Sequence, residues 1–133
     1  MTLAVSRPAR LINAGVSLTS TNQTTVYTVP ANHGAVFKRI IIAETSGNAT
    51  GITLELTDAS ASATYKMLSA KSVGANDYLL LDLELNLNES DVIKLTAATA
   101  NRLQAVLSID EIFLANNSYA SYELFRINKS CFI

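Results

Sequence analysis

The chain has one histidine, His33, which is the residue best suited to acid–base catalysis because an unperturbed imidazole titrates close to neutral pH. His33 lies in the segment PANHG at residues 30–34, whose proline, asparagine and glycine are typical of a turn. A catalytic histidine acts on a nucleophile or water held beside it, and no sequence motif supplies such a partner. We therefore interpret His33 as a turn residue on the surface, and we expect no catalytic residue and no enzymatic activity.

The segment DASAS at residues 58–62 has the pattern D-x-S-x-S, with Asp58, Ser60 and Ser62 at its polar positions. In von Willebrand A-type domains this pattern holds Mg²⁺ where a parallel strand ends in an α/β fold. The runs on either side of residues 58–62 predict antiparallel strands instead, and the helices of an α/β fold are missing. Because short Asp, Ser and Ala stretches are common in turns, we predict a turn here rather than a metal site.

The longest acidic stretch contains Asp82, Glu84, Glu89 and Asp91. Paired carboxylates could serve a glycosidase, and a larger group could bind calcium. Asp82 and Glu84 are two residues apart on the polar face of a predicted strand, and the other two fall in the turn after it. We interpret the stretch as a solvated face that protects a leucine-rich strand from pairing with other chains, with weak calcium binding as the alternative.

Other features argue against whole classes of function. The net charge is −1, and the cations Lys38, Arg39 and Arg102 form no basic stripe, so we expect no nucleic-acid partner. The single cysteine, Cys131, has no partner for an internal disulfide. No phosphate loop, dinucleotide fingerprint or C-x-x-C pair is present, so we expect no cofactor and no metal. We find no signal peptide and no apolar run of about 20 residues, which predicts synthesis in the cytoplasm and no membrane contact.

Strands must position these residues, because apolar and polar residues alternate with period two along most of the chain. In the segment LLLDLELNL at residues 79–87 every second residue is leucine, whereas a helix would need apolar residues at Asp82 and Asn86. Turn-forming segments separate about eight such runs: 10–18, 24–29, 35–43, 51–57, 64–68, 79–87, 92–96 and 103–112. Short strands spaced about 8–12 residues apart predict an all-β fold, an antiparallel β-sandwich of either jelly-roll or immunoglobulin-like topology.

The two ends of the chain lie outside the clearest part of this pattern. We predict an N-terminal arm over residues 1–22, a β-sandwich domain over 23–112 and a C-terminal aromatic tail over 113–133. The tail holds more than half of the phenylalanine and tyrosine residues, so it must pack on its own domain or on a neighbour. The charged fraction is 16%, compared with about 25% in typical soluble proteins, which favours a permanent homo-oligomer.

Several segments, taken in order, are similar to a known family. They are TVYTVPAN at residues 25–32, the run 37–43 with the turn TSGNA at 45–49, LNESDVIKLTA at 87–97, and VLSIDEI at 106–112. This succession resembles small β-sandwich virion proteins of tailed bacteriophages, which include capsid decoration (cement) proteins. The sequence departs from the family pattern at residues 32–34, which replace a glycine-led turn, and at residues 89–90, which replace the glycine before Asp91.

The resemblance implies a structural protein of the virion, made in the host bacterial cytoplasm, with a capsid decoration protein as the first expectation. It implies a homo-oligomer, with a trimer favoured, whose partners are the major capsid protein or other virion proteins. We expect apolar residues of the two ends to supply much of the contact energy: Leu11, Ile12, Val16, Leu18, Tyr119, Tyr122, Phe125 and Phe132. Deletion of residues 1–19 should then weaken assembly and leave the domain folded. The alternative is a tail, neck, baseplate or fibre component whose loops at 45–50 and 69–77 bind a receptor or a glycan.

Overall fold

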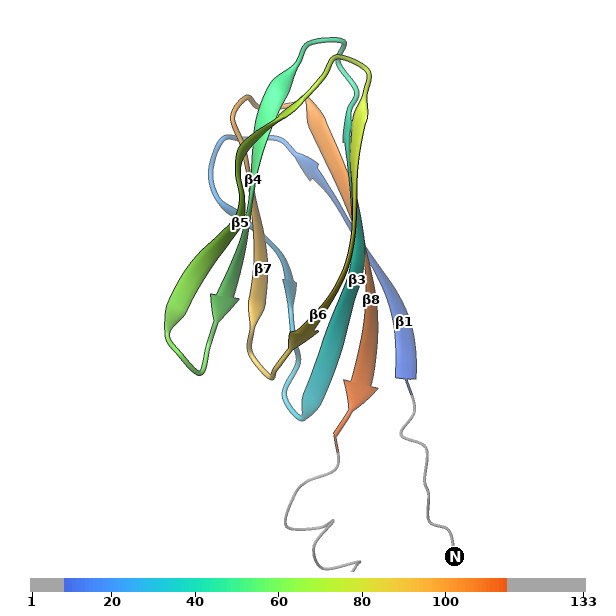
Figure 1. The fold of residues 1–133 in the computed structure, drawn as a ribbon, viewed down its shortest axis with the longest axis vertical. Helices are drawn as coiled ribbons and strands as arrows, with labels where there is room; N and C mark the ends of the chain where they lie inside the picture. The colour runs from blue at the N-terminus through green and yellow to red at the C-terminus, as the bar shows by residue number, and fades with distance from the viewer. Residues whose placement is uncertain (1–8, 115–133) are drawn as a thin grey trace, which may run out of the picture.

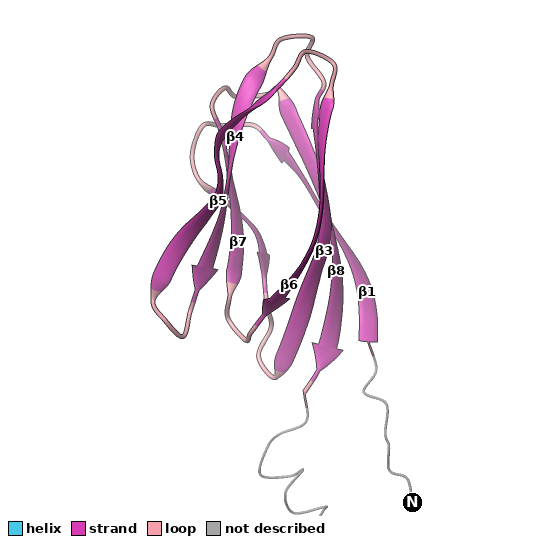
Figure 2. Ribbon diagram, in the orientation of Figure 1, coloured by secondary structure: helices cyan, strands magenta, loops and turns pink. Residues whose placement is uncertain are grey.

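The computed structural model describes residues 9–114, and these form strands, turns and short loops with no helix (Figures 1 and 2). This confirms the predicted all-β sandwich of eight strands. The strands are β1 (Ala9–Leu18), β2 (Thr24–Thr28), β3 (His33–Glu44), β4 (Thr50–Asp58), β5 (Ala63–Val73), β6 (Tyr78–Leu87), β7 (Val92–Ala97) and β8 (Leu103–Phe113).

The strand order decides between the two predicted topologies. One sheet has the order β1-β8-β3-β6 and the other β2-β7-β4-β5, and every pairing is antiparallel. The first strand pairs with the last, the second with the seventh, the third with the sixth and the fourth with the fifth. The chain is thus one long hairpin, bent at the β4–β5 turn and rolled into two sheets, which is the jelly-roll arrangement.

The core lies between the two sheets and follows the alternation of the sequence. Its fully buried members include Phe37, Ile40, Ile42, Ile52, Leu54, Ile93, Leu95 and Leu107. A side chain in a strand points to the opposite face from its neighbours, so one apolar residue in every two is enough to fill this layer. The alternation of the sequence therefore encodes which residues meet in the core.

A β-bulge in β3 explains how Lys38 and Arg39 interrupt an apolar run without entering the core. The register of β3 against both of its neighbours shifts between Phe37 and Arg39. A bulge inserts an extra residue and lets two consecutive side chains avoid the interior. Phe37 and Ile40 stay fully buried on either side, while Lys38 and Arg39 remain accessible.

Strand β5 is longer than the predicted run 64–68, because it continues to Val73. The added residues, SAKS at 69–72, have little β propensity, and Ala70 has a positive φ of 49°. They pair with the start of β4, where Ser72 faces Gly51, and the Ala70 amide donates a hydrogen bond to Thr53 Oγ1. Pairing with β4 thus imposes the strand, which local propensity does not predict.

The predicted N-terminal arm over residues 1–22 needs a correction, because β1 is an integral strand. It pairs with β8 in unbroken register from Ala9–Ile112 to Leu18–Leu103. The side chain of Leu18 is 1% exposed and belongs to the core. The partner strand lies about ninety positions later in the sequence, so the alternation of residues 10–18 predicts a strand but does not show where it pairs.

Candidate protein-interaction surface

The outer face of the β1-β8-β3-β6 sheet carries three exposed apolar side chains in register. Val106 of β8 faces Ile41 of β3, and Ile41 faces Leu80 of β6, so the three lie side by side across adjacent strands. Their exposed fractions are 46%, 41% and 44%. We call Val106, Ile41 and Leu80 the apolar row. It ends at Gly15 of β1, which faces Val106 and adds no side chain.

A charged band lies next to the apolar row on the same face. The bulge presents Lys38 and Arg39 there; Arg39 Nε donates a hydrogen bond to Asp82, and Lys38 Nζ lies 3.4 Å from Glu84 and 3.9 Å from Asp110. Exposed pairs of this kind add little stability in water, but they gain in strength if a partner covers them. Together with Leu11 and Asn13, these residues line a shallow depression of about 820 Å³.

The outer face of the β2-β7-β4-β5 sheet is polar by comparison. Its cross-strand neighbours include Thr25 with Lys94, Glu55 with Lys94 and with Lys66, and Thr53 with Thr96. None of these side chains is a large apolar one. The two outer faces therefore differ in kind, and the apolar row belongs to the face that is suited to contact with another protein.

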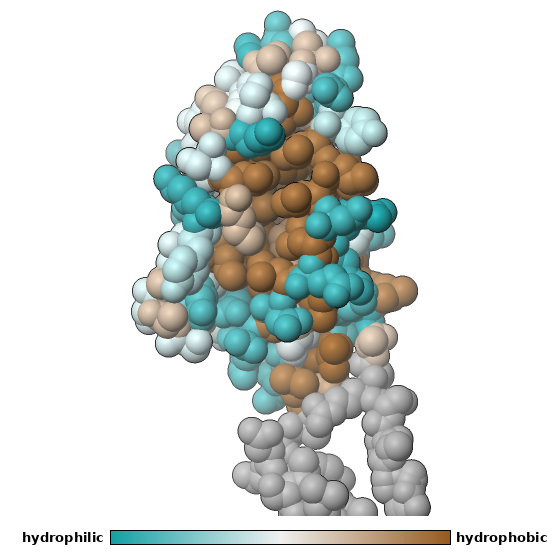
Figure 3. Space-filling view, viewed as in Figure 1, coloured by the Kyte–Doolittle hydropathy of each residue, from teal (hydrophilic) through white to brown (hydrophobic). Residues whose placement is uncertain are grey.

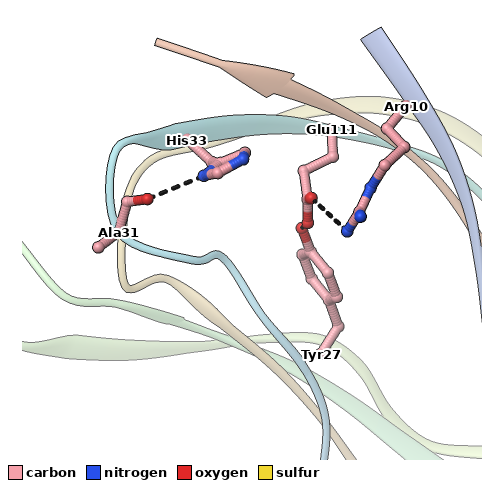
Figure 4. Close-up of polar contacts among 5 residues, drawn as sticks. All are labelled: Arg10, Tyr27, Ala31, His33 and Glu111. Atoms are coloured by element: carbon pink, nitrogen blue, oxygen red, sulfur yellow. Dashed lines mark hydrogen bonds and ion pairs between the residues drawn. The ribbon is translucent and has the colours of Figure 1, made fainter. Parts of the chain in front are cut away.

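A buried polar cluster joins three strands at the end of the sandwich where the described chain begins and ends (Figure 4). Tyr27 of β2 donates a hydrogen bond of 2.6 Å to Glu111 of β8, and Arg10 of β1 donates one of 3.0 Å to the same carboxylate. Burial, together with the hydrogen bond to Glu111, raises the pKa of the Tyr27 hydroxyl. Since Glu111 is only 2% exposed, these donors supply the partners that a buried carboxylate needs.

His33 lies beside this cluster and takes the structural position that the sequence predicts. Its Nδ1 donates a hydrogen bond of 2.8 Å to the carbonyl oxygen of Ala31, inside the turn before β3 (Figure 4). Its ring packs edge-on against Phe113, with 5.3 Å between the ring centres. His33 and Glu111 line the same small hollow, but the Glu111 carboxylate is already bonded to Tyr27 and Arg10.

The segment DASAS is a turn between β4 and β5, as predicted. Asp58 Oδ1 accepts hydrogen bonds from Ser60 Oγ and from the amides of Ser60 and Ala61. These bonds, the one from the Ser60 hydroxyl most of all, lower the pKa of Asp58. No group of three or more His, Cys, Asp or Glu side chains within residues 9–114 is arranged to hold a metal ion.

The four carboxylates of the acidic stretch have different surroundings. Asp82 and Glu84 are exposed on the outer face of β6, in agreement with the predicted solvated face. Asp91 is buried and accepts hydrogen bonds from the amides of Ala59 and Asn88, so it joins two turns. The interpretation of a wholly solvated stretch was therefore wrong for Asp91, because the turn that contains it folds back over the end of the sandwich.

Glu44, a residue that sequence reasoning overlooked, organises the opposite end of the sandwich. It is 2% exposed, and its carboxylate accepts hydrogen bonds from Ser46 Oγ and from the amides of Ser46, Gly47, Asn48 and Asn76. Burial alone would raise the pKa of Glu44, but the hydrogen bonds prevail and lower it to about 2. The sequence signal that could have identified Glu44 is the position of an acidic residue between an apolar run and the turn TSGN.

Glu44 thereby holds two of the loops assigned above to a receptor- or glycan-binding tip. The β3–β4 loop and the β5–β6 turn meet through its carboxylate, since Asn76 belongs to the second and the other donors to the first. Tyr78 follows the tip and is well exposed. Tyr65, in contrast, lies near the start of β5, at the end of that strand away from the tip.

The eight predicted interface residues fall into three groups. Leu11 is 81% exposed, so it is available to a partner. Ile12 and Val16 are half-buried against the core, and Leu18 is fully buried, because β1 turns these side chains inward. Tyr119, Tyr122, Phe125 and Phe132 lie outside the described residues. Sequence reasoning also missed the apolar row, since the outward position of Ile41 and Val106 depends on the register of three strands.

Comparisons with known proteins reveal a shared fold at low sequence identity. No protein-family model and no curated protein sequence matches the chain. A chain in the acidic stable capsid of Helicobacter pylori bacteriophage KHP30 is similar, with 10% identity, a TM-score of 0.50, and coverage of 81% of this chain and 90% of that chain.

Two further solved structures have lower TM-scores. A chain of the cyanophage Pam1 capsid asymmetric unit has 17% identity and a TM-score of 0.42, with coverage of 86% of this chain and 94% of that chain. The Drosophila NLP core has 12% identity and a TM-score of 0.45, with coverage of 75% and 96%. Because one fold hosts many functions, the likeness to the KHP30 chain establishes the jelly-roll fold alone. No described residue lies in a helix that could cross a membrane.

Proposed function

We propose that the chain is a structural protein of a bacteriophage virion, a capsid decoration protein that stabilises the shell through protein–protein contacts. The observation that carries this proposal is the apolar row, together with its charged band, on one outer sheet face of a closely packed jelly roll. The likeness of the fold to a chain of the KHP30 capsid supports it. The partners are other copies of the chain, arranged as a homotrimer, and the major capsid protein.

The outer face offers both parts of a stable interface. The apolar row supplies a water-excluding centre, and the charged band supplies polar contacts that select a partner and its orientation. A standard interface buries about 1,200–2,000 Å² in total, which is more than three side chains provide. The contact therefore extends along the sheet to Tyr78 on β6 and to Leu11 on β1, both of which are well exposed.

A second candidate function is a tail, neck, baseplate or fibre component with a binding tip. The loops joined by Glu44, with Tyr78 beside them, favour this alternative. A glycan site usually offers an aromatic platform, and the chain has no tryptophan. A glycan array probed with the full chain distinguishes the two, because a decoration protein binds shells and no glycan.

The decoration role is tested by co-sedimentation of the full chain with phage shells that lack it, combined with light scattering across a dilution series. Ile41→Asp, in the centre of the apolar row, should reduce both the bound fraction and the solution mass. Thr25→Asp, at an exposed position on the polar outer face, is the matched control and should change neither. If Ile41→Asp had the same bound fraction and solution mass as the native chain, the apolar row would not be part of the interface and the proposal would be wrong.

A further inference from the structure

One lateral side of the sandwich, between the edge strands β5 and β6, leaves core side chains accessible. We call Met67 and Leu68 of β5 and Leu79, Leu81, Leu83 and Leu85 of β6 the β5–β6 strip; all six pack against the core and are only partly buried. Figure 3 shows apolar surface over the middle of this side, flanked by polar residues. Monomers rarely leave a contiguous apolar surface of this kind uncovered, so something is expected to cover it.

The free edge of β6 adds a second unmet requirement. Among residues 9–114, β6 is the last strand of its sheet and pairs with β3 alone, so within this part of the chain the backbone groups on its other side have no partner strand. It has 10 residues and contains no proline, which makes it a good template for another extended segment. A strand added at this edge would satisfy the backbone and lie against the β5–β6 strip at once.

The described chain ends close to this edge. The amide of Leu114 donates a hydrogen bond of 2.8 Å to the carbonyl oxygen of Asn32, which fixes how the chain leaves β8. A methyl group at Gly34 of β3 would lie 3.6 Å from Leu114 Cδ1 and 3.7 Å from the carbonyl oxygen of Leu87. Leu114 and the last residue of β6 therefore flank the same residue of β3, the strand that lies between β8 and β6 in the sheet.

The remaining sequence has the length and composition to cover the strip. Residues 115–133 follow Leu114, and an extended chain of that length reaches about 60 Å, whereas β6 is about 33 Å long. The segment includes Tyr119, Tyr122, Leu124, Phe125 and Ile127, and its charged residues number only three: Glu123, Arg126 and Lys129. These apolar side chains match the leucine-lined surface in chemistry.

We propose that residues 115–133 of the same chain add to the free edge of β6 as a further, antiparallel strand and cover the β5–β6 strip. The addition would be antiparallel, because β6 ends at Leu87, near Leu114, and a segment that starts at Leu114 and follows β6 would run against its direction. The inference goes beyond the proposed function and does not depend on it, since a single chain supplies both the uncovered strip and the segment that covers it.

Hydrogen exchange of the full chain tests the covering of β6. We compare the native chain with a variant that carries Tyr119→Ser, Tyr122→Ser, Leu124→Ser and Phe125→Ser, and with a control that carries Asn117→Ser and Asn128→Ser. The first variant should exchange β6 amides about tenfold faster, while β1, the other edge of the sheet, stays unchanged. The control should match the native chain. Equal β6 exchange in all three proteins would overturn the proposal.

A spin label on Cys131, the only cysteine, gives an independent test of position. In a labelled chain the nitroxide should broaden the methyl resonances of Leu79 and Leu81, at the end of β6 that the tail reaches last, and leave Ile12, on the other edge strand and near the opposite end of the sheet, sharp. The label leaves the described residues unchanged, so this test does not rely on a variant that must fold. Broadening seen only when labelled and isotope-enriched chains are mixed would place a neighbour's tail on the strip and overturn the assignment to the same chain.

Discussion

The two lateral sides of the sandwich are built differently. On the β1–β2 side, Leu18 and Tyr27 are buried while Ile12, Val16 and Val26 are half-buried. The bonds from Tyr27 and Arg10 to Glu111 join β2, β8 and β1. On the β5–β6 side, only Val73 and Leu87 at the strand ends are buried, and the leucines between them stay half-exposed. The β1–β2 side is thus joined by a buried polar cluster, whereas the β5–β6 side presents half-exposed leucines between its strand ends.

Regular alternation along a strand therefore does not ensure that its apolar face is buried. β6 alternates regularly along its whole length, yet four of its five inward leucines are only partly buried. β1 is less regular but is held by β8 along its whole length. The burial of an edge strand depends on the side chains that pack against it. Four experiments compare how much the β1–β2 side and the β5–β6 side contribute to stability.

The largest effect is expected from removal of the closed side. Deletion of residues 1–19 takes away β1 and Leu18, which exposes the edge of β8 and the core beside it and leaves the Glu111 carboxylate without its Arg10 partner. We expect loss of the cooperative thermal transition in circular dichroism, in contrast to the folded domain that the arm hypothesis predicts. A native-like spectrum with a cooperative thermal transition would instead support the hypothesis that residues 1–22 are an arm.

A pair of matched substitutions compares the sides directly. Leu18→Ala creates a cavity in the closed side and should lower the free energy of unfolding by about 3 kcal/mol. Leu83→Ala, at a leucine of β6, should lower it by about as much if the tail covers the strip as proposed above, and by only about 1 kcal/mol if the strip is open to water. Urea titration of both variants measures the two values. A loss at Leu83 as large as that at Leu18 would mean that the strip is covered in solution.

Tyr27→Phe tests the polar closure of the β1–β2 side. It removes the hydroxyl and leaves the buried Glu111 carboxylate with Arg10 alone, which should lower the free energy of unfolding by about 1–3 kcal/mol. Tyr65→Phe, at an exposed position, is the control and should stay within about 0.5 kcal/mol of the native chain. Equal stability of the two variants would make the Tyr27 bond energetically neutral.

The smallest effect concerns Glu44, which ties the β5–β6 turn to the β3–β4 loop. The pKa of Glu44 falls from its ordinary 4.5 to about 2 in the folded chain, so its carboxylate stabilises the fold above pH 4.5 and loses that contribution as the pH falls through 2. The melting temperature of Glu44→Gln should therefore lie below that of the native chain near pH 6, and the difference should shrink towards pH 2. Glu89→Gln, in an exposed turn, is the control. If the difference in melting temperature between Glu44→Gln and the native chain stayed constant with pH, the effect of the substitution would come from side-chain packing and not from the charge of Glu44.

Sequence reasoning located the strands well but did not identify which apolar side chains face outward together. The alternation predicted all eight runs, and it failed mainly at the end of β5, where pairing with β4 outweighs the weak propensity of residues 69–72. The interface prediction relied on apolar residues near the ends and therefore included Leu18, which is a core residue. The apolar row escaped notice because Ile41, Leu80 and Val106 belong to three strands that are far apart in the sequence.

The strand content and the inward face of each strand follow from local sequence, because a two-residue period is a local property of the backbone. Which strands are neighbours depends on the three-dimensional fold, and the jelly-roll order, the place of β1 and the row formed by Ile41, Leu80 and Val106 depend on it in turn. It also decided that Glu44, Asp91 and Glu111 are buried, each with hydrogen-bond donors from other segments. Pairing between distant segments selects these features, and no local pattern of residues encodes such pairing.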